Sequence, residues 1–146
     1  MFVDISEKKI VVVGGGQIAS RRIRTLGSFA KNIWVVSPEV SEEIHILADE
    51  KKIHWIGETY HQKYIADADM VLAATDDILC NEQVAGDCQR LRIPVNVSHK
   101  KELCDFYFPA VVLTEDVVIG ISSDGNRHKK VREIREKIEK INEADN

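Results

Sequence analysis

The chain has few of the residues that cross-link small proteins, because only three of its 146 residues are cysteine. Cys80, Cys88 and Cys104 are odd in number and match neither zinc-site nor disulfide-framework spacing. We therefore expect buried thiols and predict no metal site.

Long hydrophobic runs and an excess of positive charge are also missing. No stretch approaches the roughly 20 apolar residues that a membrane span requires, and the N-terminus has no signal-peptide pattern. The formal net charge is −4 at pH 7, so no basic stripe is available to neutralise phosphates outside the last expected helix. We expect a cytoplasmic protein with neither a membrane nor nucleic acid as its partner.

Internal repeats, low-complexity segments and linkers are absent as well. Hydrophobic residues make up 44% of the sequence and charged residues 30%, which is typical of a globular protein. The length suits one domain with a sizeable core. These features predict a single domain over residues 1–146.

The most informative stretch is a glycine-rich turn between an apolar strand and a helix. Residues 9–13 are rich in β-branched side chains without polar alternation, as in a parallel strand covered on both faces. Gly14 permits a tight turn, Gly16 lets the backbone approach a pyrophosphate, and Ala19 allows close helix packing. Free N–H groups at the helix start form an anion site. The pattern predicts a dinucleotide site, with a plain βα turn as the alternative.

The helix after this turn has an apolar face. That face consists of Ile18, Ala19, Ile23 and Leu26. We expect it to pack against the sheet, because apolar residues at this spacing fall on one side of a helix.

The second expected strand, residues 32–36, ends at Ser37, Pro38 and Glu39. A dinucleotide fold uses this end to contact the adenosine ribose, commonly with an acidic residue. Ser37 occupies that position, and a hydroxyl bonds a ribose oxygen without repelling a phosphate. This loop therefore leaves NAD and NADP both open. Ser41 is expected to cap the helix that follows.

Two further buried strands, residues 69–73 and 93–97, are expected to end at the same edge of the sheet. Ligands of doubly wound sheets bind outside the carboxyl ends of the strands, so we expect both following loops to line the crevice beside the glycine turn. Helix capping by Asp76 or Asp77 is a compatible alternative. The polar residues at these two ends are Thr75, Asp76, Asp77, Asn96, Ser98 and His99.

The C-terminal part is expected to hold a hairpin and a helix. Residues 106–113 and 117–122 form two apolar segments joined by a short turn. A charged helix follows from residue 127, with an apolar stripe that packs on the sheet or on a second subunit. The whole pattern predicts an α/β fold with a Rossmann-like doubly wound, mostly parallel sheet, a C-terminal β-hairpin and a terminal helix.

Taken in chain order, these motifs resemble the precorrin-2 dehydrogenase and sirohydrochlorin ferrochelatase family, which includes the N-terminal module of siroheme synthase. The resemblance covers nearly the whole chain. It implies a dinucleotide-binding fold, NAD as acceptor of a hydride from precorrin-2, and insertion of ferrous iron in bifunctional members. The matching segments are residues 12–19 with Arg22, 36–39, 73–77, 95–97, 103–106, 108–110, and 121–123 with Gly125.

The resemblance also implies roles for individual residues. The pyrophosphate is expected to contact Gly14, Gly15, Gly16, Gln17 and Ile18. The adenosine is expected to contact Ser37, Pro38 and Glu39, and the nicotinamide is expected to lie beside Thr75 and Asp76. His99, or else Asp105, is expected to manage the proton that leaves as the hydride is transferred.

His99 departs from the family pattern, which commonly has an aspartate at this place. An imidazole can accept or relay a proton, so dehydrogenation remains chemically feasible. Metal insertion would lack the carboxylate, although a neutral imidazole can bind an incoming metal. The alternative is a solvent-exposed loop residue without a role.

Two other departures lie in the C-terminal part. Residues 124–130 are basic where the family commonly has a glycine-, hydroxyl- and proline-containing turn. This charge either attracts the carboxylates of a tetrapyrrole substrate or belongs to a solvated helix start. The helical region that builds the family's dimer and covers its substrate cleft does not follow. We still expect a homodimer from the apolar stripe of the last helix.

Two alternative functions remain open. The chain could be a non-catalytic NAD- or tetrapyrrole-binding module that acts as a sensor, carrier or subunit, which would account for His99. A nucleotide-sensing regulatory domain of an ion transporter is the third interpretation. Ser37 in place of an acid and the match over residues 103–110 weigh against it.

Overall fold

The structure is a computed structural model that describes residues 1–123 and 127–144. The predicted motif residue Gly125 and the rest of segment 124–126 lie outside the described residues. The chain divides into two compact units, Met1–Phe106 and Tyr107–Asn146. The single domain over residues 1–146 stays a prediction.

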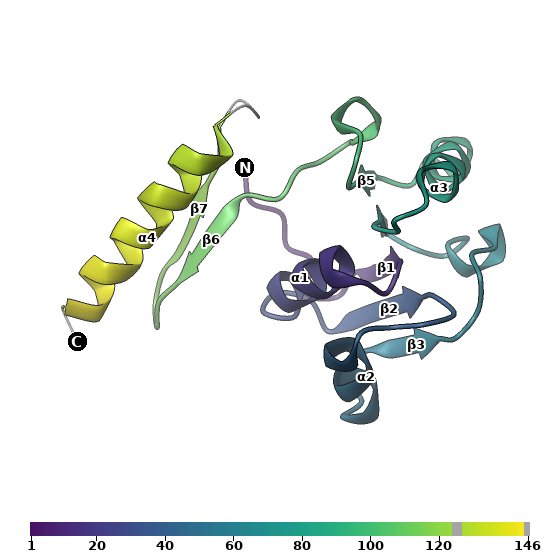
Figure 1. The fold of residues 1–146 in the computed structure, drawn as a ribbon, viewed down its shortest axis with the longest axis horizontal. Helices are drawn as coiled ribbons and strands as arrows, with labels where there is room; N and C mark the ends of the chain where they lie inside the picture. Colours follow the sequence, from purple (N-terminus) through teal and green to yellow (C-terminus); the bar gives the residue numbers. More distant parts are fainter. Residues whose placement is uncertain (124–126, 145–146) are drawn as a thin grey trace. The chain divides into compact units, whose positions relative to one another are not determined.

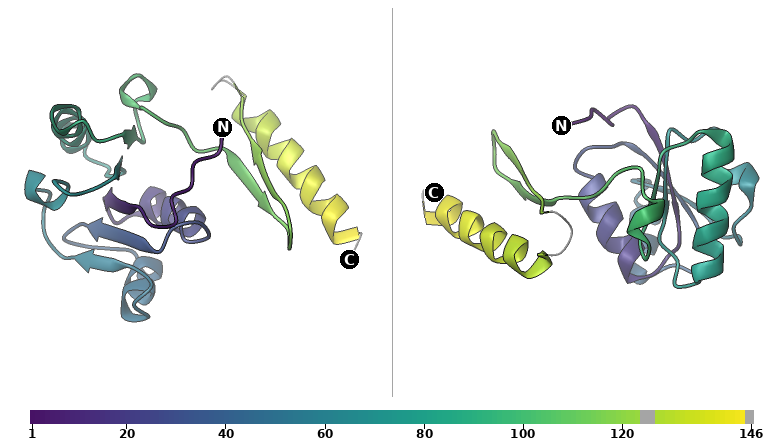
Figure 2. Two further views of the ribbon diagram at one scale, coloured as in Figure 1. Left: turned by 180° about the vertical axis from the view of Figure 1, so that it is seen from behind. Right: turned by 90° about the horizontal axis from the view of Figure 1, so that it is seen from above.

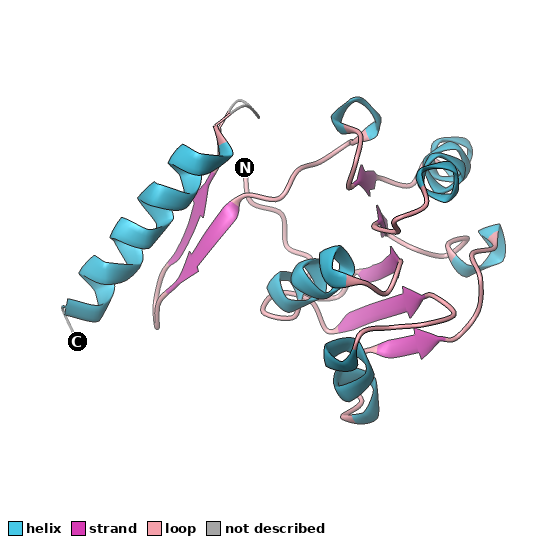
Figure 3. Cartoon of the chain, viewed as in Figure 1, coloured by secondary structure: helices cyan, strands magenta, loops and turns pink. Residues whose placement is uncertain are grey.

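The first unit contains a five-stranded parallel sheet in the order β3-β2-β1-β4-β5 (Figure 1). Strands and helices alternate along the chain (Figure 3). The strands are β1 (Lys9–Val13), β2 (Asn32–Val36), β3 (His54–Ile56), β4 (Met70–Ala73) and β5 (Val95–Val97). The helices are α1 (Gln17–Leu26), α2 (Glu42–Asp49) and α3 (Ile78–Leu91), with 3₁₀ turns η1 (Gln62–Tyr64) and η2 (Lys101–Leu103). The predicted Rossmann-like sheet is confirmed.

The strand order reverses its direction between β1 and β4. Right-handed crossovers that move away from β1 in opposite directions place their helices on opposite faces of the sheet. Figure 2 shows this arrangement, with α1 and α3 on the two sides of the strands. The change of direction creates a switch point at the carboxyl ends of β1 and β4, where ligands bind in this class of fold.

The core of this unit is built on β1, whose residues from Ile10 to Val13 are at most 1% exposed. Both predicted helix caps are present. The Ser41 hydroxyl accepts a hydrogen bond from the amide of Ile44, and the Asp77 carboxylate accepts from the amides of Leu79 and Cys80. Asp77, and not Asp76, is therefore the residue that caps α3.

Backbone groups along the outer edge of β5 form hydrogen bonds with the chain segment that follows η2. Val95 and Asp105 exchange two hydrogen bonds: the amide of Val95 donates to the Asp105 carboxylate at 2.9 Å, and the amide of Asp105 donates to the Val95 carbonyl at 2.8 Å. The Val97 amide donates to the Cys104 sulfur at 3.1 Å. This segment covers an edge that would otherwise expose unpaired backbone groups.

The second unit is a hairpin covered by a helix. Strands β6 (Ala110–Leu113) and β7 (Val118–Ile121) pair antiparallel, and α4 (His128–Ala144) packs on both. The predicted hairpin and terminal helix are confirmed, although the strands are shorter than expected. No described residue of α4 is buried, and none of the described helices combines the length and apolarity needed to cross a membrane.

Candidate functional site

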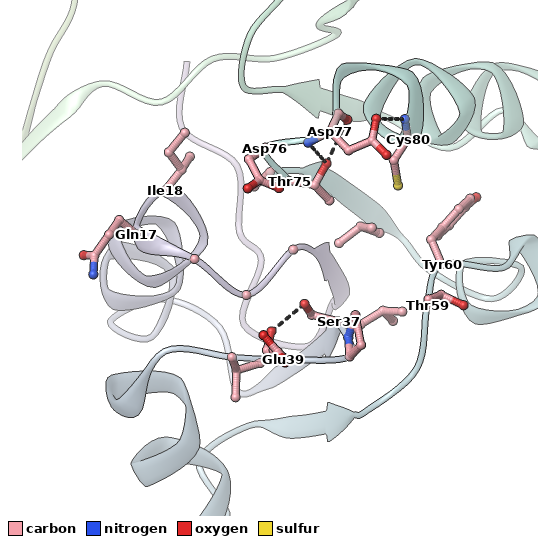
Figure 4. A pocket seen from close by; sticks show the side chains of 18 of the residues that line it. Gln17, Ile18, Ser37, Glu39, Thr59, Tyr60, Thr75, Asp76, Asp77 and Cys80 are labelled. Carbon is pink, nitrogen blue, oxygen red and sulfur yellow. Dashed lines mark hydrogen bonds between the residues drawn. The ribbon is translucent and has the colours of Figure 1, made fainter.

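The ends of β1, β2 and β4 open onto a cavity of about 890 Å³ in the first unit (Figure 4). The glycine turn lies between the β2–α2 loop and the β4–α3 loop. All residues predicted to contact the cofactor line this cavity, although their binding roles stay predictions. They are Gly14, Gly15, Gly16, Gln17, Ile18, Ser37, Pro38, Glu39, Thr75 and Asp76.

The first two glycines allow the turn to touch both neighbouring loops. Gly14 has φ +125°, and a Cβ at this position would overlap the carbonyl oxygen of Ala74. A Cβ at Gly15 would overlap the carbonyl oxygen of Glu39, and the Gly15 carbonyl accepts a hydrogen bond from the amide of Ser41 at 2.7 Å. These two glycines are therefore required by the packing of the protein itself.

Gly16 has a different environment, because a Cβ at this position would meet no atom within 4 Å. It is the N-cap residue of α1, and its lack of a side chain leaves the helix start without a side-chain cap. Amide groups at a helix N-terminus attract anions, and open space beside them admits a phosphate. The site therefore fits the pyrophosphate of a dinucleotide.

Ile18 does not lie on the buried face of α1, although the sequence predicted it there. Ala19, Ile23 and Leu26 are buried as predicted, whereas Ile18 is 39% exposed and lines the cavity. Its position in the first turn of α1 places it at the mouth of the switch point and not over the sheet. Its predicted place beside the cofactor is compatible with this location.

The β2–α2 loop offers oxygen atoms and a negative charge to the cavity. The Ser37 hydroxyl donates to the carbonyl of Glu39 at 2.6 Å, which leaves its lone pairs available to accept from a ligand. The indole of Trp55 donates to the Ser37 carbonyl at 2.9 Å and fixes the loop. No lysine or arginine is among the described residues that line the cavity.

The β4–α3 loop is held by Asn81, a residue that the sequence analysis did not single out. Asn81 is 1% exposed. The Thr75 amide donates to its side-chain oxygen at 3.1 Å, and its side-chain nitrogen donates to the Thr75 carbonyl at 3.0 Å. Asn81 lies three residues before Val84 and seven before Cys88, which places it on the apolar face of α3. This spacing indicates a buried polar residue.

The residues at the end of β5 do not line the cavity, contrary to the expectation for Asn96, Ser98 and His99. Asn96 is 5% exposed, and its side chain donates to the carbonyl of Phe106 at 2.8 Å. His99 is exposed, and its ring Nδ1 lies 3.2 Å from the side-chain nitrogen of Asn81. His99 therefore reaches the cavity loop only through Asn81.

Asp105, the other candidate for proton transfer, lies away from this cavity. Its carboxylate accepts from the amide of Val95 at the outer edge of β5. It lines a separate cavity of about 730 Å³ beside α3 and β5. Its observed contacts stabilise the sheet edge.

Two further residues of the cavity wall were not predicted. The Tyr60 hydroxyl donates to the carboxylate of Asp87 at 2.7 Å, and Asp87 is 3% exposed and also paired with Arg90. Burial and the hydrogen bond to Asp87 raise the pKa of Tyr60, so its hydroxyl stays protonated. Burial and the nearby Asp77 carboxylate raise the pKa of Cys80, so its thiol is not activated as a nucleophile.

The described residues contain no group of three or more His, Cys, Asp or Glu side chains that could hold a metal ion. The cavity wall consists of backbone groups and of hydroxyl, carboxylate, carboxamide, thiol and apolar side chains. This composition suits a ligand that is bound and oriented without covalent attachment to the protein.

Comparison with known proteins assigns the family. Residues 1–110 match the profile of a family described as "Putative NAD(P)-binding". The chain belongs to this NAD(P)-binding family. It is homologous to the N-terminal region of siroheme synthase and to the precorrin-2 dehydrogenase SirC.

Two curated relatives and one solved structure illustrate the similarity. The siroheme synthases of Psychrobacter cryohalolentis and Nitrosospira multiformis are 38% and 36% identical over 97% and 95% of this chain. The chain spans only 27% and 30% of their lengths. The structure of "SirC, precorrin-2 dehydrogenase" superposes with a TM-score of 0.83 at 25% identity, covering 94% of this chain and 67% of that protein.

A pair of substitutions separates ligand binding from folding. Gly16→Ala places a methyl group in open space, so we expect a Tm close to that of the wild type and at least about tenfold weaker NAD binding. Gly14→Ala forces a strained φ and an overlap with Ala74, which we expect to lower the free energy of unfolding by about 2 kcal/mol or more. Thermal denaturation and calorimetric titration measure both effects. Unchanged NAD affinity in Gly16→Ala would contradict the placement of the pyrophosphate.

Proposed function

We propose that this chain binds NAD and removes two hydrogens from precorrin-2, giving sirohydrochlorin. One observation carries the proposal: a glycine turn with open space beside Gly16 borders a cavity of about 890 Å³ at the switch point of a parallel sheet. Similarity to siroheme synthases and to a precorrin-2 dehydrogenase over nearly the whole chain supports the choice of a tetrapyrrole substrate.

In the proposed reaction one hydrogen leaves the substrate as a hydride and the other as a proton. The nicotinamide ring, when bound, supplies the hydride acceptor. The amides at the start of α1 hold the pyrophosphate, and the Ser37 oxygen accepts from the adenosine ribose. Thr75 and Asp76 border the nicotinamide side, where the buried Asn81 fixes the Thr75 backbone.

The charges of the cavity favour NAD over NADP. The 2′-phosphate of NADP carries a charge of about −1.5 to −2, and it would lie near the Glu39 carboxylate in the loop that meets the adenosine. No lysine or arginine among the described lining residues offsets this repulsion. NAD, which has hydroxyls on that ribose, avoids the unfavourable contact.

A test of this preference compares the Kd of NAD with that of NADP. We expect NADP to bind at least about tenfold more weakly, since like charges in a cavity repel. Glu39→Arg is expected to bring the Kd of NADP closer to the Kd of NAD. Glu42→Arg makes the same charge change at an exposed position outside the cavity and serves as the control. Equal affinities in the wild type would refute the preference.

We also propose that the chain forms a homodimer with a second copy of itself. The described sheet of this unit has two strands, so both are edge strands whose outer backbone groups can pair with another chain. Apolar side chains of this unit are exposed, among them Val118 at 42% and Ile141 at 63%. A homodimer that joins two such units would bury these side chains.

Sedimentation equilibrium tests the dimer. We expect a mass about twice the 16.5 kDa of one chain, and Val118→Lys is expected to shift the equilibrium toward the monomer. Leu79→Lys changes a side chain of the first unit that is 76% exposed and controls for unspecific apolar association. A wild-type chain that is monomeric at micromolar concentration would exclude this proposal.

The activity itself is tested anaerobically with purified protein, NAD and enzymatically generated precorrin-2. We expect sirohydrochlorin absorbance to rise well above the rate without protein. Later addition of ferrous ion tests metal insertion separately. NAD binding without turnover would favour the alternative, a non-catalytic NAD- or tetrapyrrole-binding module.

A further inference from the structure

The buried side chain of Asn81 connects the loop that lines the cavity to the ring of His99. Asn81 is 1% exposed, and its amide contacts Thr75 and His99, which follow the adjacent strands β4 and β5. Because Asn81 is enclosed, its hydrogen bonds leave little freedom for a different arrangement.

The orientation of the Asn81 amide is fixed by the backbone of Thr75. A backbone amide can only donate and a carbonyl can only accept, so the Asn81 oxygen must face the Thr75 amide and the Asn81 nitrogen must face the Thr75 carbonyl. Rotating the Asn81 side-chain amide by half a turn would place its NH₂ group against the Thr75 N–H and its oxygen against the Thr75 carbonyl. The second N–H of the Asn81 amide then remains for the atom 3.2 Å away, which is Nδ1 of His99.

This contact determines which nitrogen of a neutral His99 ring carries the proton. Nδ1 must be unprotonated, because it accepts from Asn81 and a proton on it would face another proton. The proton of the neutral ring therefore lies on Nε2. Within the described part of the chain no residue hydrogen-bonds Nε2, and the ring is exposed.

We propose that Asn81 holds His99 in the Nε2–H tautomer, so that His99 binds a carboxylate of the substrate as a hydrogen-bond donor instead of acting as a base. This inference revises the sequence expectation that His99 takes up the proton. The class of ligand rests on the proposed function, because the tetrapyrrole substrate carries several carboxylates. Asn81 acts as a positioning residue.

The surroundings of His99 contain charges of both signs. Lys100 and Lys101 follow it and are exposed, and the Lys100 ammonium lies 3.3 Å from the Glu82 carboxylate, which offsets its charge. Glu102 is exposed as well. The preference for an anionic group therefore rests on the Nε2–H donor, from which a carboxylate accepts a hydrogen bond.

The first experiment measures the His99 tautomer directly, by long-range ¹H–¹⁵N NMR spectra of the full chain at about pH 9, where an ordinary imidazole is neutral. The chain has five histidines, so His99→Gln identifies the His99 signals by their loss. We expect a protonated Nε2 and an unprotonated Nδ1. Protonation at Nδ1, or an even mixture of tautomers, would overturn the proposal.

The second experiment tests whether Asn81 is the cause. Asn81→Asp replaces the donor beside Nδ1 with an acceptor, which we expect to move the His99 proton to Nδ1. Gln89→Glu makes the same amide-to-carboxylate change at an exposed position of α3 and is expected to leave the tautomer unchanged. An Nε2–H tautomer that persists in folded Asn81→Asp would refute the role of Asn81. If that variant does not fold, the wild-type spectrum still decides the tautomer.

The third experiment separates a donor from a base by kinetics with NAD and precorrin-2. A glutamine amide can donate near the position of Nε2 but cannot take up a proton at neutral pH. We expect His99→Ala to raise KM by about tenfold or more, His99→Gln to raise it less, and kcat to change less than KM in both. A large and equal loss of kcat in both variants, with KM unchanged, would identify a base and overturn the proposal. Absence of turnover in the wild type would refute the proposed function and the choice of ligand that rests on it, whereas the NMR spectra would still decide the His99 tautomer and the role of Asn81.

Discussion

Two close backbone contacts at glycine hold the candidate site together. Neither Gly14 nor Gly15 has room for a Cβ, because the carbonyl oxygens of Ala74 and Glu39 lie against them. These contacts bring the loops after β2 and β4 against the turn after β1, so that one cavity borders all three. Gly16 faces open space instead. The turn thus combines two requirements: its first two glycines close the fold, and its third leaves the helix start accessible to a phosphate.

The outer edge of β5 imposes a second constraint, which decides what Asp105 can do. A carboxylate that accepts a backbone amide hydrogen bond stabilises the strand edge, and its loss would leave the Val95 amide unsatisfied. The carbonyl of Val95 is satisfied by the same residue. Asp105 therefore serves to satisfy the backbone of Val95 at the edge of the sheet. Of the two residues that the resemblance implies for proton transfer, only His99 is connected to a loop of the cavity.

Features that depend on neighbouring residues could be predicted from the sequence. The β-branched run of β1 and the strand β2 were predicted with their observed bounds, and Asp77 was one of two expected caps. The residues predicted to contact the cofactor were expected to share a cavity because the carboxyl ends of parallel strands meet at one edge, and they line one cavity in the structure. The sequence could not predict side-chain partners distant in the chain. Asn96 was wrongly expected at the crevice because its partner, the carbonyl of Phe106, is set by the path of the chain after η2.

An imidazole at position 99 differs from a carboxylate at the same position in which of its atoms donate and which accept hydrogen bonds. The resemblance implies an aspartate at this place in relatives, and both of its oxygens would accept, including from an Asn81-like donor. An imidazole accepts from Asn81 at Nδ1 only by keeping its proton at Nε2. In our proposal the buried Asn81 amide therefore makes His99 a hydrogen-bond donor at Nε2, whereas it would leave an oxygen of an aspartate free to accept. In the proposed reaction, the proton released with the hydride would then pass to water or to a group other than His99, because Nε2 of the neutral ring already carries a proton.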